Sequence, residues 1–163
     1  MKRVIILGGG YGGQAVANEL IERGIPSDTI ITLIDRMPFQ GLKTEYYALA
    51  AGTVSDHQLR VAFPSDPKLL LMYGEVLDVD MERQVVVMED QNELEYDSLV
   101  IALGCTDKFH GITGAEAYAC TIQTFSAARN TYRQLNDLKA YGQVSTVGGG
   151  LSGVEVAAEL RES

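Results

Sequence analysis

A segment of 17 residues occurs twice in this chain, at positions 4–20 and again at positions 144–160. The copies read VIILGGGYGGQAVANEL and VSTVGGGLSGVEVAAEL, and they are identical at nine positions. In each copy an apolar run leads into three glycines at the spacing G-x-G-x-x-G, and apolar residues at helical spacing follow. Each copy therefore predicts a β-strand, a tight glycine turn and an α-helix.

The predicted turn suits the binding of a diphosphate. Its first glycine makes the turn, the second lets the backbone approach a pyrophosphate, and the third lets helix and strand pack closely. Amide groups at the start of the helix point at the anion, and the helix dipole adds about half a positive charge there. This local field can hold a diphosphate even in a chain of formal net charge −9. An ordinary tight turn between strand and helix is the alternative interpretation of the glycines alone.

The surroundings of the first copy favour a dinucleotide. The strand predicted at 30–34 ends at Asp35, which lies 22 residues after Gly13. A carboxylate at this place hydrogen-bonds a ribose hydroxyl of an adenine dinucleotide. Arg36 is a further candidate, with an ordinary surface position as the alternative. The candidate cofactor-binding residues of the two glycine turns are Gly8, Gly10, Tyr11, Gly12, Gly13, Gly148, Gly150 and Gly153.

Composition narrows the class of protein. A chain of 163 residues that is 46% hydrophobic and 21% charged is typical of a soluble globular protein. Its acidic balance argues against nucleic acid as a partner. No apolar run approaches the roughly 20 residues of a membrane span, and the N-terminus enters a strand rather than a signal peptide, so we expect a cytoplasmic protein. Cys105 and Cys120 lack metal-ligand spacing, and we expect buried thiols and no metal site.

The segment after Asp35 predicts a loop and a short helix. Thr44 is the expected N-cap of a helix that runs to Ala51 and is closed by Gly52. Lys43 and Thr44 are candidate contacts to a cofactor or substrate. The neighbouring pair Tyr46 and Tyr47 either shares that contact or packs half-buried, and a cap at Ser55 precedes a surface histidine, His57.

The rest of the chain predicts a meander and a last sheet strand. Short alternating runs over 69–97 indicate an antiparallel β-meander. The run 98–102 predicts a strand buried on both faces, and parallel sheets bind ligands beyond the carboxyl ends of such strands. Ser126 is the expected cap of a helix through Leu138. The fold class is therefore α/β, a Rossmann-like parallel sheet with an inserted antiparallel β-meander.

This order of motifs resembles the FAD-dependent pyridine nucleotide oxidoreductase family over essentially the whole chain. IDRMPFQGLKTEYYALAAGT and YDSLVIALG are most similar to the type II NADH dehydrogenases, in particular the NADH dehydrogenase-like proteins of Bacillus-type bacteria. The resemblance implies FAD at the first glycine turn and NAD(P)H at the second. It also implies a ribose contact at Asp35, an adenine-side backbone contact at Val76, and a late turn at Ala102 and Gly104.

The resemblance gives one residue a catalytic role. Glu155, inside the second copy, matches a glutamate near the nicotinamide–flavin region that is implicated in coupling NADH to the acceptor side. The polar face of a helix is the alternative interpretation. Residues 36–56 contain none of the redox cysteines of the disulfide-reductase branches, which argues against a thiol–disulfide relay in this loop.

We expect two domains, an FAD-binding domain at 1–142 without its C-terminal segment and the first strand and helix of a truncated NAD(P)H-binding domain at 143–163. The parent protein is expected to transfer hydride from NAD(P)H to FAD and electrons to a small acceptor such as a quinone, while the fragment alone is expected to lack turnover. A non-catalytic flavin-binding or nucleotide-binding redox sensor is the alternative.

The sequence also suggests how the fragment associates. Residues 143–147 have the character of a strand that fills the open sheet edge, either in the same chain or in a second chain of a homodimer. Membrane contact is expected only through a C-terminal region beyond residue 163, which would place the full protein peripherally at the inner face of the cell membrane. The choice between NADH and NADPH stays open.

Overall fold

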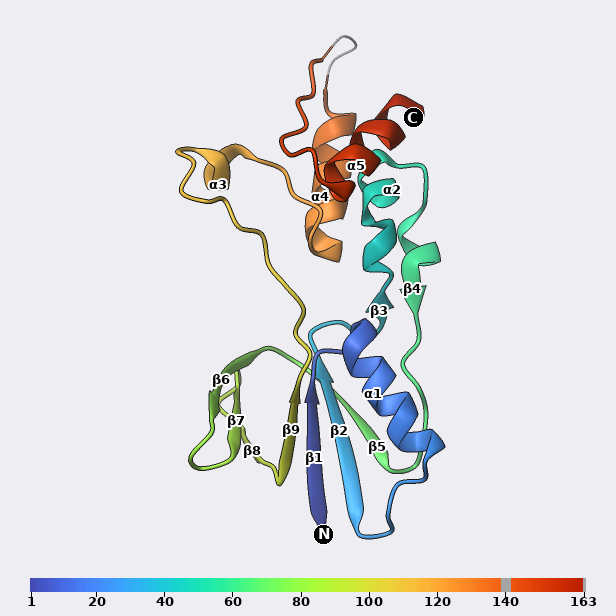
Figure 1. Cartoon of the computed structure of the whole chain (residues 1–163), viewed down its shortest axis with the longest axis vertical. Helices are drawn as coiled ribbons and strands as arrows, with labels where there is room; N and C mark the ends of the chain where they lie inside the picture. The colour runs from blue at the N-terminus through green and yellow to red at the C-terminus, as the bar shows by residue number, and fades with distance from the viewer. Residues whose placement is uncertain (139–141, 163) are drawn as a thin grey trace. The chain divides into compact units, whose positions relative to one another are not determined.

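The computed structural model describes residues 1–138 and 142–162, and its chain divides into two compact units (Figure 1). The first unit is Met1–Gln40 with Val61–Gly104, and the second is Gly41–Arg60 with Cys105–Ser163. Ser163, the end of the expected second domain, lies outside the described residues. These units follow contacts within the chain, and the domain division expected at residue 142 stays a prediction.

A parallel sheet of four strands in the order β5-β2-β1-β9 organises the first unit (Figure 1). Helix α1 connects β1 to β2, and all three pairings are parallel. The carboxyl ends of the strands therefore meet at one edge, which is where such sheets place ligands. The fold class predicted from the repeat is confirmed. The elements are β1 (Lys2–Leu7), α1 (Tyr11–Glu22), β2 (Thr29–Asp35), β5 (Leu69–Tyr73) and β9 (Ser98–Ile101).

The two faces of this sheet bury different partners. Ile6 and Leu33 point to the face that α1 covers, where they pack with Ala17. Because successive strand residues point to opposite faces, Ile5 and Leu7 lie on the other face. They pack there against residues of the meander strand β7 and against Tyr96. The sheet is thus buried by a helix on one side and by an antiparallel meander on the other.

The meander is shorter than the sequence indicated. It consists of β6 (Val76–Asp80), β7 (Val85–Met88) and β8 (Glu93–Glu95), paired antiparallel. The assignment of Leu69–Tyr73 to the meander is wrong, because β5 pairs in parallel with β2. A short apolar run fits either kind of sheet, and only its pairing partner decides between them.

Strand β9 differs from the expected strand that is buried on both faces. Among the described strands it pairs only with β1, so it forms an edge of the sheet. Ile101 near its end is 60% exposed. The apolar sequence of this strand is that of a central strand, but its position here is that of an edge strand.

The second unit is mostly helical. In this unit α2 contacts both α4 and α5. The chain passes between the units in β3 (Gln40–Gly41) and β4 (Arg60–Val61), which form a small sheet. Within the described parts of the chain, no helix is long and apolar enough to cross a bilayer. The helices are η1 (Lys43–Glu45), α2 (Tyr46–Ala51), η2 (Asp56–Leu59), α3 (Ala115–Tyr118), α4 (Phe125–Asn136) and α5 (Leu151–Glu162).

The expected helix ends are partly confirmed. Gly52 closes α2 in the left-handed conformation, with φ 85°, and its N–H donates to the carbonyl oxygens of Ala48 and Leu49. Ser55 begins η2 in a capping box with Gln58, as the sequence indicates.

Two predicted caps are wrong. Thr44 lies inside the 3-10 turn η1, and α2 begins after Glu45 without a side-chain cap. The cap of α4 is Thr124 rather than Ser126, since the Thr124 hydroxyl accepts a hydrogen bond of 3.1 Å from the Ala127 amide. The sequence offers two hydroxyl residues two positions apart, and its pattern does not select between them.

The expected strand at 143–147 does not form. Residues 142–149 have no strand structure, and all of them are exposed, with Val147 at 89%. The hypothesis that this segment fills the sheet edge is therefore wrong for the described structure. A strand is stable only with hydrogen-bonded neighbours, and no described strand supplies them.

We predict that Gly13→Ala lowers the free energy of unfolding by about 3 kcal/mol, because of overpacking against backbone that cannot move aside. A Cβ at this position would lie 1.8 Å from the Gly8 carbonyl oxygen. The measurement is urea denaturation followed by circular dichroism. The matched control is Gly10→Ala, where φ is −72° and a Cβ would meet nothing within 4 Å. Equal stability of the two variants would contradict the prediction.

We predict that Gln14→Met stabilises the protein by about 1 kcal/mol. Gln14 is 9% exposed, and among the described residues its amide Nε2 is buried without a hydrogen-bond partner. Methionine keeps the length of the side chain and removes the unsatisfied amide. The same denaturation experiment measures the change, and Gln143→Met at an exposed position outside helix and strand is the control, with an expected change near zero. A loss of stability in Gln14→Met alone would show that the amide has a role in folding.

Candidate functional site

The first glycine turn lies in the first unit, at the carboxyl edge of its sheet. Gly8 follows β1 with φ 94°, and its amide donates to the Ile34 carbonyl of β2 over 2.8 Å. On the other side, the Ala102 amide donates to the Leu7 carbonyl over 2.8 Å. A Cβ at Gly8 would lie 2.4 Å from the Ala102 oxygen. Only glycine therefore fits between the ends of the neighbouring strands.

The start of α1 presents amides toward an open side of this turn. The first helical hydrogen bond runs from the Gln14 amide to the Gly10 carbonyl over 3.0 Å. The amides of Gly12 and Gly13 precede it, so the helix itself does not use them. A Cβ at Gly10 would meet nothing within 4 Å. Helix amides beside open backbone are the donor set that a diphosphate requires, so this turn fits a diphosphate group, and its binding of FAD stays a prediction.

The Asp35 carboxylate joins the end of β2 to the glycine turn. Its Oδ2 accepts a hydrogen bond of 2.6 Å from the Gly9 amide, and its Oδ1 accepts one of 2.8 Å from the Met37 amide. The two oxygens of a carboxylate have about four lone-pair sites in total. Asp35 can therefore order the turn and still accept hydrogen bonds from ribose hydroxyls.

An aromatic pair that no sequence motif predicts lies near this carboxylate. The Phe63 ring lies against Gly9, where a Cβ would come within 2.3 Å of the ring. Phe63 and Tyr73 are nearly parallel, with ring centroids 6.5 Å apart, and Tyr73 is the register partner of Asp35. Phe63 belongs to no recognisable sequence motif. Its position against the first turn appears only in the folded chain.

The structure also describes the surroundings of the other candidate cofactor-binding residues of the first unit. Arg36 is exposed and forms an ion pair of 3.7 Å with Glu75, a contact that contributes little to stability. Val76 begins β6 and pairs with Met88, while Ala102 contacts the first turn and Gly104 has φ 77°. The first unit thus brings the turn, Asp35 and Ala102 together. Cofactor contact by Tyr11, Arg36, Val76 and Gly104 stays a prediction.

The second glycine turn repeats the geometry of the first within the second unit. Gly148 has φ 118°, and a Cβ at Gly153 would lie 2.0 Å from the Gly148 oxygen. The Val154 amide donates to the Gly150 carbonyl over 3.1 Å, which is the counterpart of the Gln14 bond in the first turn. The turn and helix therefore form although no strand precedes them. Binding of a nucleotide by this turn stays a prediction.

The ammonium group of Lys43 lies beside Cys105, in a loop of the second unit. Its Nζ lies 3.3 Å from the Cys105 carbonyl oxygen and 3.3 Å from the Cys105 Sγ. Cys105 and Cys120 are both exposed, so the expectation of buried thiols is wrong. Each lies in a loop without regular structure, Cys105 after β9 and Cys120 after α3, and its side chain is exposed there. A cofactor contact by Lys43 or Thr44 stays a prediction.

Glu155 lies near a tyrosine of α2. The Tyr47 hydroxyl donates to the Glu45 carboxylate over 3.1 Å. This hydrogen bond is the main reason that the pKa of Tyr47 is raised above its ordinary value, and the charges of Glu155 and Glu159 on α5 raise it further. Tyr46, in contrast, is buried and packs edge to face on Phe125. Glu155 thus lies on a helix, α5, that contacts the helix of Tyr47, and its catalytic role stays a prediction.

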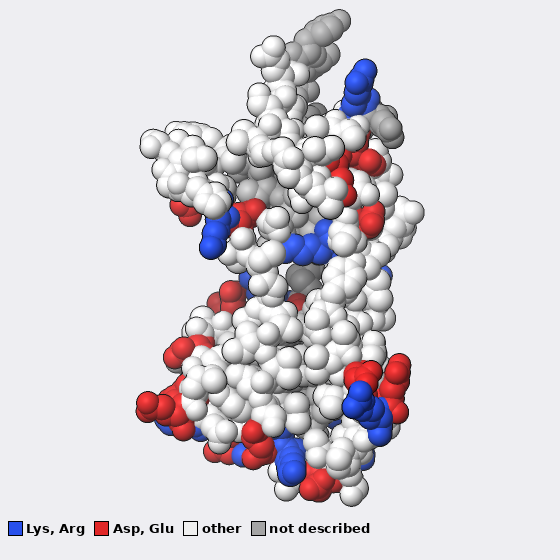
Figure 2. Space-filling view, in the orientation of Figure 1, with Lys and Arg blue, Asp and Glu red and all other residues white. Residues whose placement is uncertain are grey.

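The charged side chain that contacts the first turn is that of Asp35, whose carboxylate accepts a hydrogen bond from the Gly9 amide. On the face shown in Figure 2, most charged side chains of the first unit lie around its margin, and uncharged side chains cover most of the middle. No group of three or more histidine, cysteine or acidic residues within the described ranges could hold a metal ion. The attraction for an anion at the first turn therefore comes from backbone amides.

Comparison with curated proteins shows relatives along the whole chain. The NADH dehydrogenase-like protein YutJ of Bacillus subtilis (strain 168) is 49% identical over 163 residues, which are 100% of this chain and 46% of that protein. The type II NADH:quinone oxidoreductase of Staphylococcus haemolyticus is 29% identical over 99% of this chain and 43% of its own length. The chain thus spans less than half the length of these relatives.

Comparison with solved structures shows the same fold. The structure of NDH2 from Plasmodium falciparum in complex with NADH matches with a TM-score of 0.75 and 25% identity, over 97% of this chain and 36% of that one. The sulfide:quinone oxidoreductase of Aquifex aeolicus matches with a TM-score of 0.71 and 30% identity, over 84% of this chain and 32% of that one. The model of the pyridine nucleotide-disulphide oxidoreductase family matches residues 2–163, and the chain therefore belongs to this family.

Proposed function

We propose that this chain is the FAD-binding part, with the beginning of the NAD(P)H-binding part, of a flavoprotein oxidoreductase that passes electrons from NAD(P)H to a quinone-like acceptor. The observation that carries the proposal is the first glycine turn, whose helix amides face open backbone beside Asp35. The names of the relatives, which include an NADH:quinone oxidoreductase and a sulfide-quinone reductase, support the acceptor class. Residues 1–142 and 143–163 are the proposed domain segments.

The residues of the first unit bind and orient the cofactor in this proposal. The amides of Gly12 and Gly13 hold the diphosphate, and the bare backbone of Gly10 lets it approach. Asp35 accepts hydrogen bonds from the ribose, while its bond to Gly9 keeps the turn in place. FAD supplies the hydride chemistry when it is bound. The further proposed contacts are Tyr11, Arg36, Lys43, Thr44, Val76, Ala102 and Gly104.

The second turn is proposed to hold the nicotinamide cofactor of the parent protein. Its glycines, Gly148, Gly150 and Gly153, adopt the same compact turn as the first copy. Glu155 is proposed to couple the nicotinamide side to the acceptor side. Glu155 lies on α5, which contacts α2, and its charge contributes to the raised pKa of Tyr47.

We predict that the full-length parent protein purifies with, or takes up, FAD and shows flavin absorbance that bleaches when NADH or NADPH is added. The measurement is the visible spectrum under anaerobic conditions, followed by reoxidation with a soluble quinone. Flavin bands that do not respond to either nucleotide would favour a sensor. Failure to bind FAD would refute the proposal. The 163-residue chain alone is expected to show no NADH-to-dye turnover, because it spans less than half the length of its relatives.

We predict that Gly10→Ala weakens FAD binding about tenfold or more without loss of stability. The added methyl group meets no protein atom within 4 Å, but it occupies the side from which the diphosphate approaches. The measurement is FAD titration by fluorescence quenching, with urea denaturation of the same sample.

The control for this experiment is Gly149→Ala in the second unit, where φ is not left-handed and the added Cβ also meets nothing within 4 Å. Its FAD affinity is expected to equal that of the unmodified protein. Asp35→Asn is a less specific variant, because it changes both the proposed ribose contact and the existing bond to Gly9. Unchanged FAD affinity in Gly10→Ala would show that the diphosphate lies elsewhere.

A further inference from the structure

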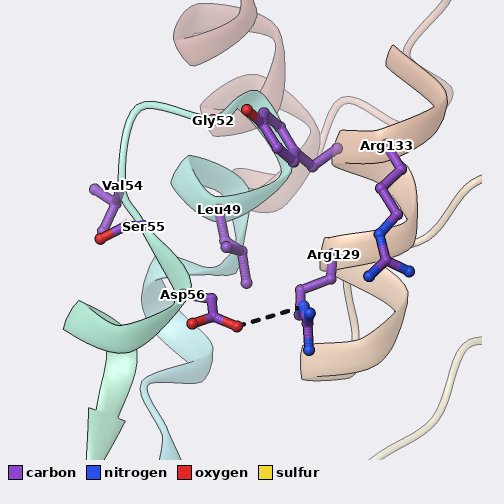
Figure 3. A pocket seen from close by; sticks show the side chains of 8 residues that line it. Leu49, Gly52, Val54, Ser55, Asp56, Arg129 and Arg133 are labelled. Atoms are coloured by element: carbon purple, nitrogen blue, oxygen red, sulfur yellow. Dashed lines mark ion pairs between the residues drawn. The ribbon is translucent and has the colours of Figure 1, made fainter. Parts of the chain in front are cut away.

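The second unit contains a pocket whose lining residues belong to neither glycine turn. It is a cavity of about 350 Å³ between the end of α2, the turn before η2 and one face of α4. This volume is near the lower end of the range of small-molecule sites in proteins. Figure 3 shows Leu49 of α2 opposite α4, with Asp56 facing Arg129. The lining residues are Leu49, Gly52, Val54, Ser55, Asp56, Arg129, Tyr132 and Arg133.

Basic side chains outnumber acidic side chains around this pocket. Asp56 is the acidic residue of the lining, and its Oδ2 already has two partners, Arg60 at 2.7 Å and Arg129 at 3.4 Å. Arg60 lies in addition over the Phe125 ring, 5.5 Å from its centroid. Arg133 lies one turn beyond Arg129 on α4, and among the described residues its guanidinium has no ion-pair partner. One carboxylate thus pairs with two guanidinium groups, and a third guanidinium group lines the same pocket.

This arrangement costs helix stability in the absence of an anion. Like charges four residues apart on a helix destabilise it by about 0.2–0.5 kcal/mol. Arg129 and Arg133 have this spacing. The two arginines thus form a local positive charge in a chain whose formal net charge is −9. An anion between the two guanidinium groups would remove the repulsion, and the planar fork of arginine donates paired hydrogen bonds to phosphate or carboxylate oxygens.

The apolar part of the pocket is already formed. Gly52 has φ 85°, and a Cβ there would lie 2.2 Å from Cε2 of Tyr132. The absence of a side chain at Gly52 therefore lets the Tyr132 ring lie against the end of α2. Leu49 is 4% exposed and supplies a fixed apolar wall. An apolar ring placed between Leu49 and Tyr132 would bring an attached anionic group to the arginines.

We propose that this pocket binds a small organic anion, with its phosphate or carboxylate group on Arg129 and Arg133 and its apolar ring against Leu49 and Tyr132. Asp56 keeps Arg129 extended into the pocket and leaves its remaining guanidinium N–H groups to the ligand. The proposal concerns the second unit alone and does not depend on the proposed oxidoreductase function.

The test is titration of the ¹⁵N-labelled chain with phenyl phosphate, monitored by amide chemical shifts. We predict saturable shifts at Gly52–Asp56 and along α4, and a dissociation constant about tenfold or more higher in Arg133→Gln. Arg133→Lys keeps the charge without the fork and is expected to bind with intermediate affinity. The matched control is Arg83→Gln in the first unit, whose arginine is also exposed and pairs with Glu93 over 2.7 Å.

Further ligands separate the contributions of charge and ring. Benzoate that competes with phenyl phosphate would extend the site to carboxylates, and benzoate that does not would restrict it to phosphates. Binding of phenol as tight as that of phenyl phosphate would overturn the proposal, as would equal affinities of Arg133→Gln and Arg83→Gln. Absence of saturable shifts in this region at millimolar phenyl phosphate would overturn it too. The amide spectrum of each variant shows whether it is folded.

Discussion

The close approach of the first glycine turn to the strand ends determines the geometry of the first unit. Gly8 bonds to β2 through Ile34, β1 bonds to Ala102 through Leu7, and the space between Gly8 and Ala102 excludes any side chain. These contacts fix where β1 ends and where α1 begins. Because α1 then crosses to β2, they also fix the position of Asp35 relative to the helix amides.

The sequence predicts this part well because the constraint is local and stereochemical. A glycine is needed where φ is positive and where helix and strand backbones touch, and both needs appear in the sequence as fixed spacings. The parallel sheet, α1, the turn at Gly52 and the cap at Ser55 follow from such rules. The position of Asp35 also follows, since the end of an apolar strand is visible in the sequence.

The parts that could not be predicted depend on contacts between distant residues. Leu69–Tyr73 joins the parallel sheet because of its partner β2, and nothing in its own sequence distinguishes this from a meander strand. Phe63 reaches Gly9 only after folding. The cysteines are exposed because of the path of their loops, although thiols are often buried. The spacing of Arg129 and Arg133 is readable on a predicted helix, but the pocket they line requires the packing of α2 on α4.

The second glycine turn shows that the conformation of this motif is contained in its own residues. Gly148–Gly153 closes with nearly the same oxygen-to-glycine approach as Gly8–Gly13, although no paired strand leads into it. The closed turn sets the first residue of α5 as it sets that of α1, and in both helices the first helical hydrogen bond returns to the middle glycine of the motif, Gly150 or Gly10.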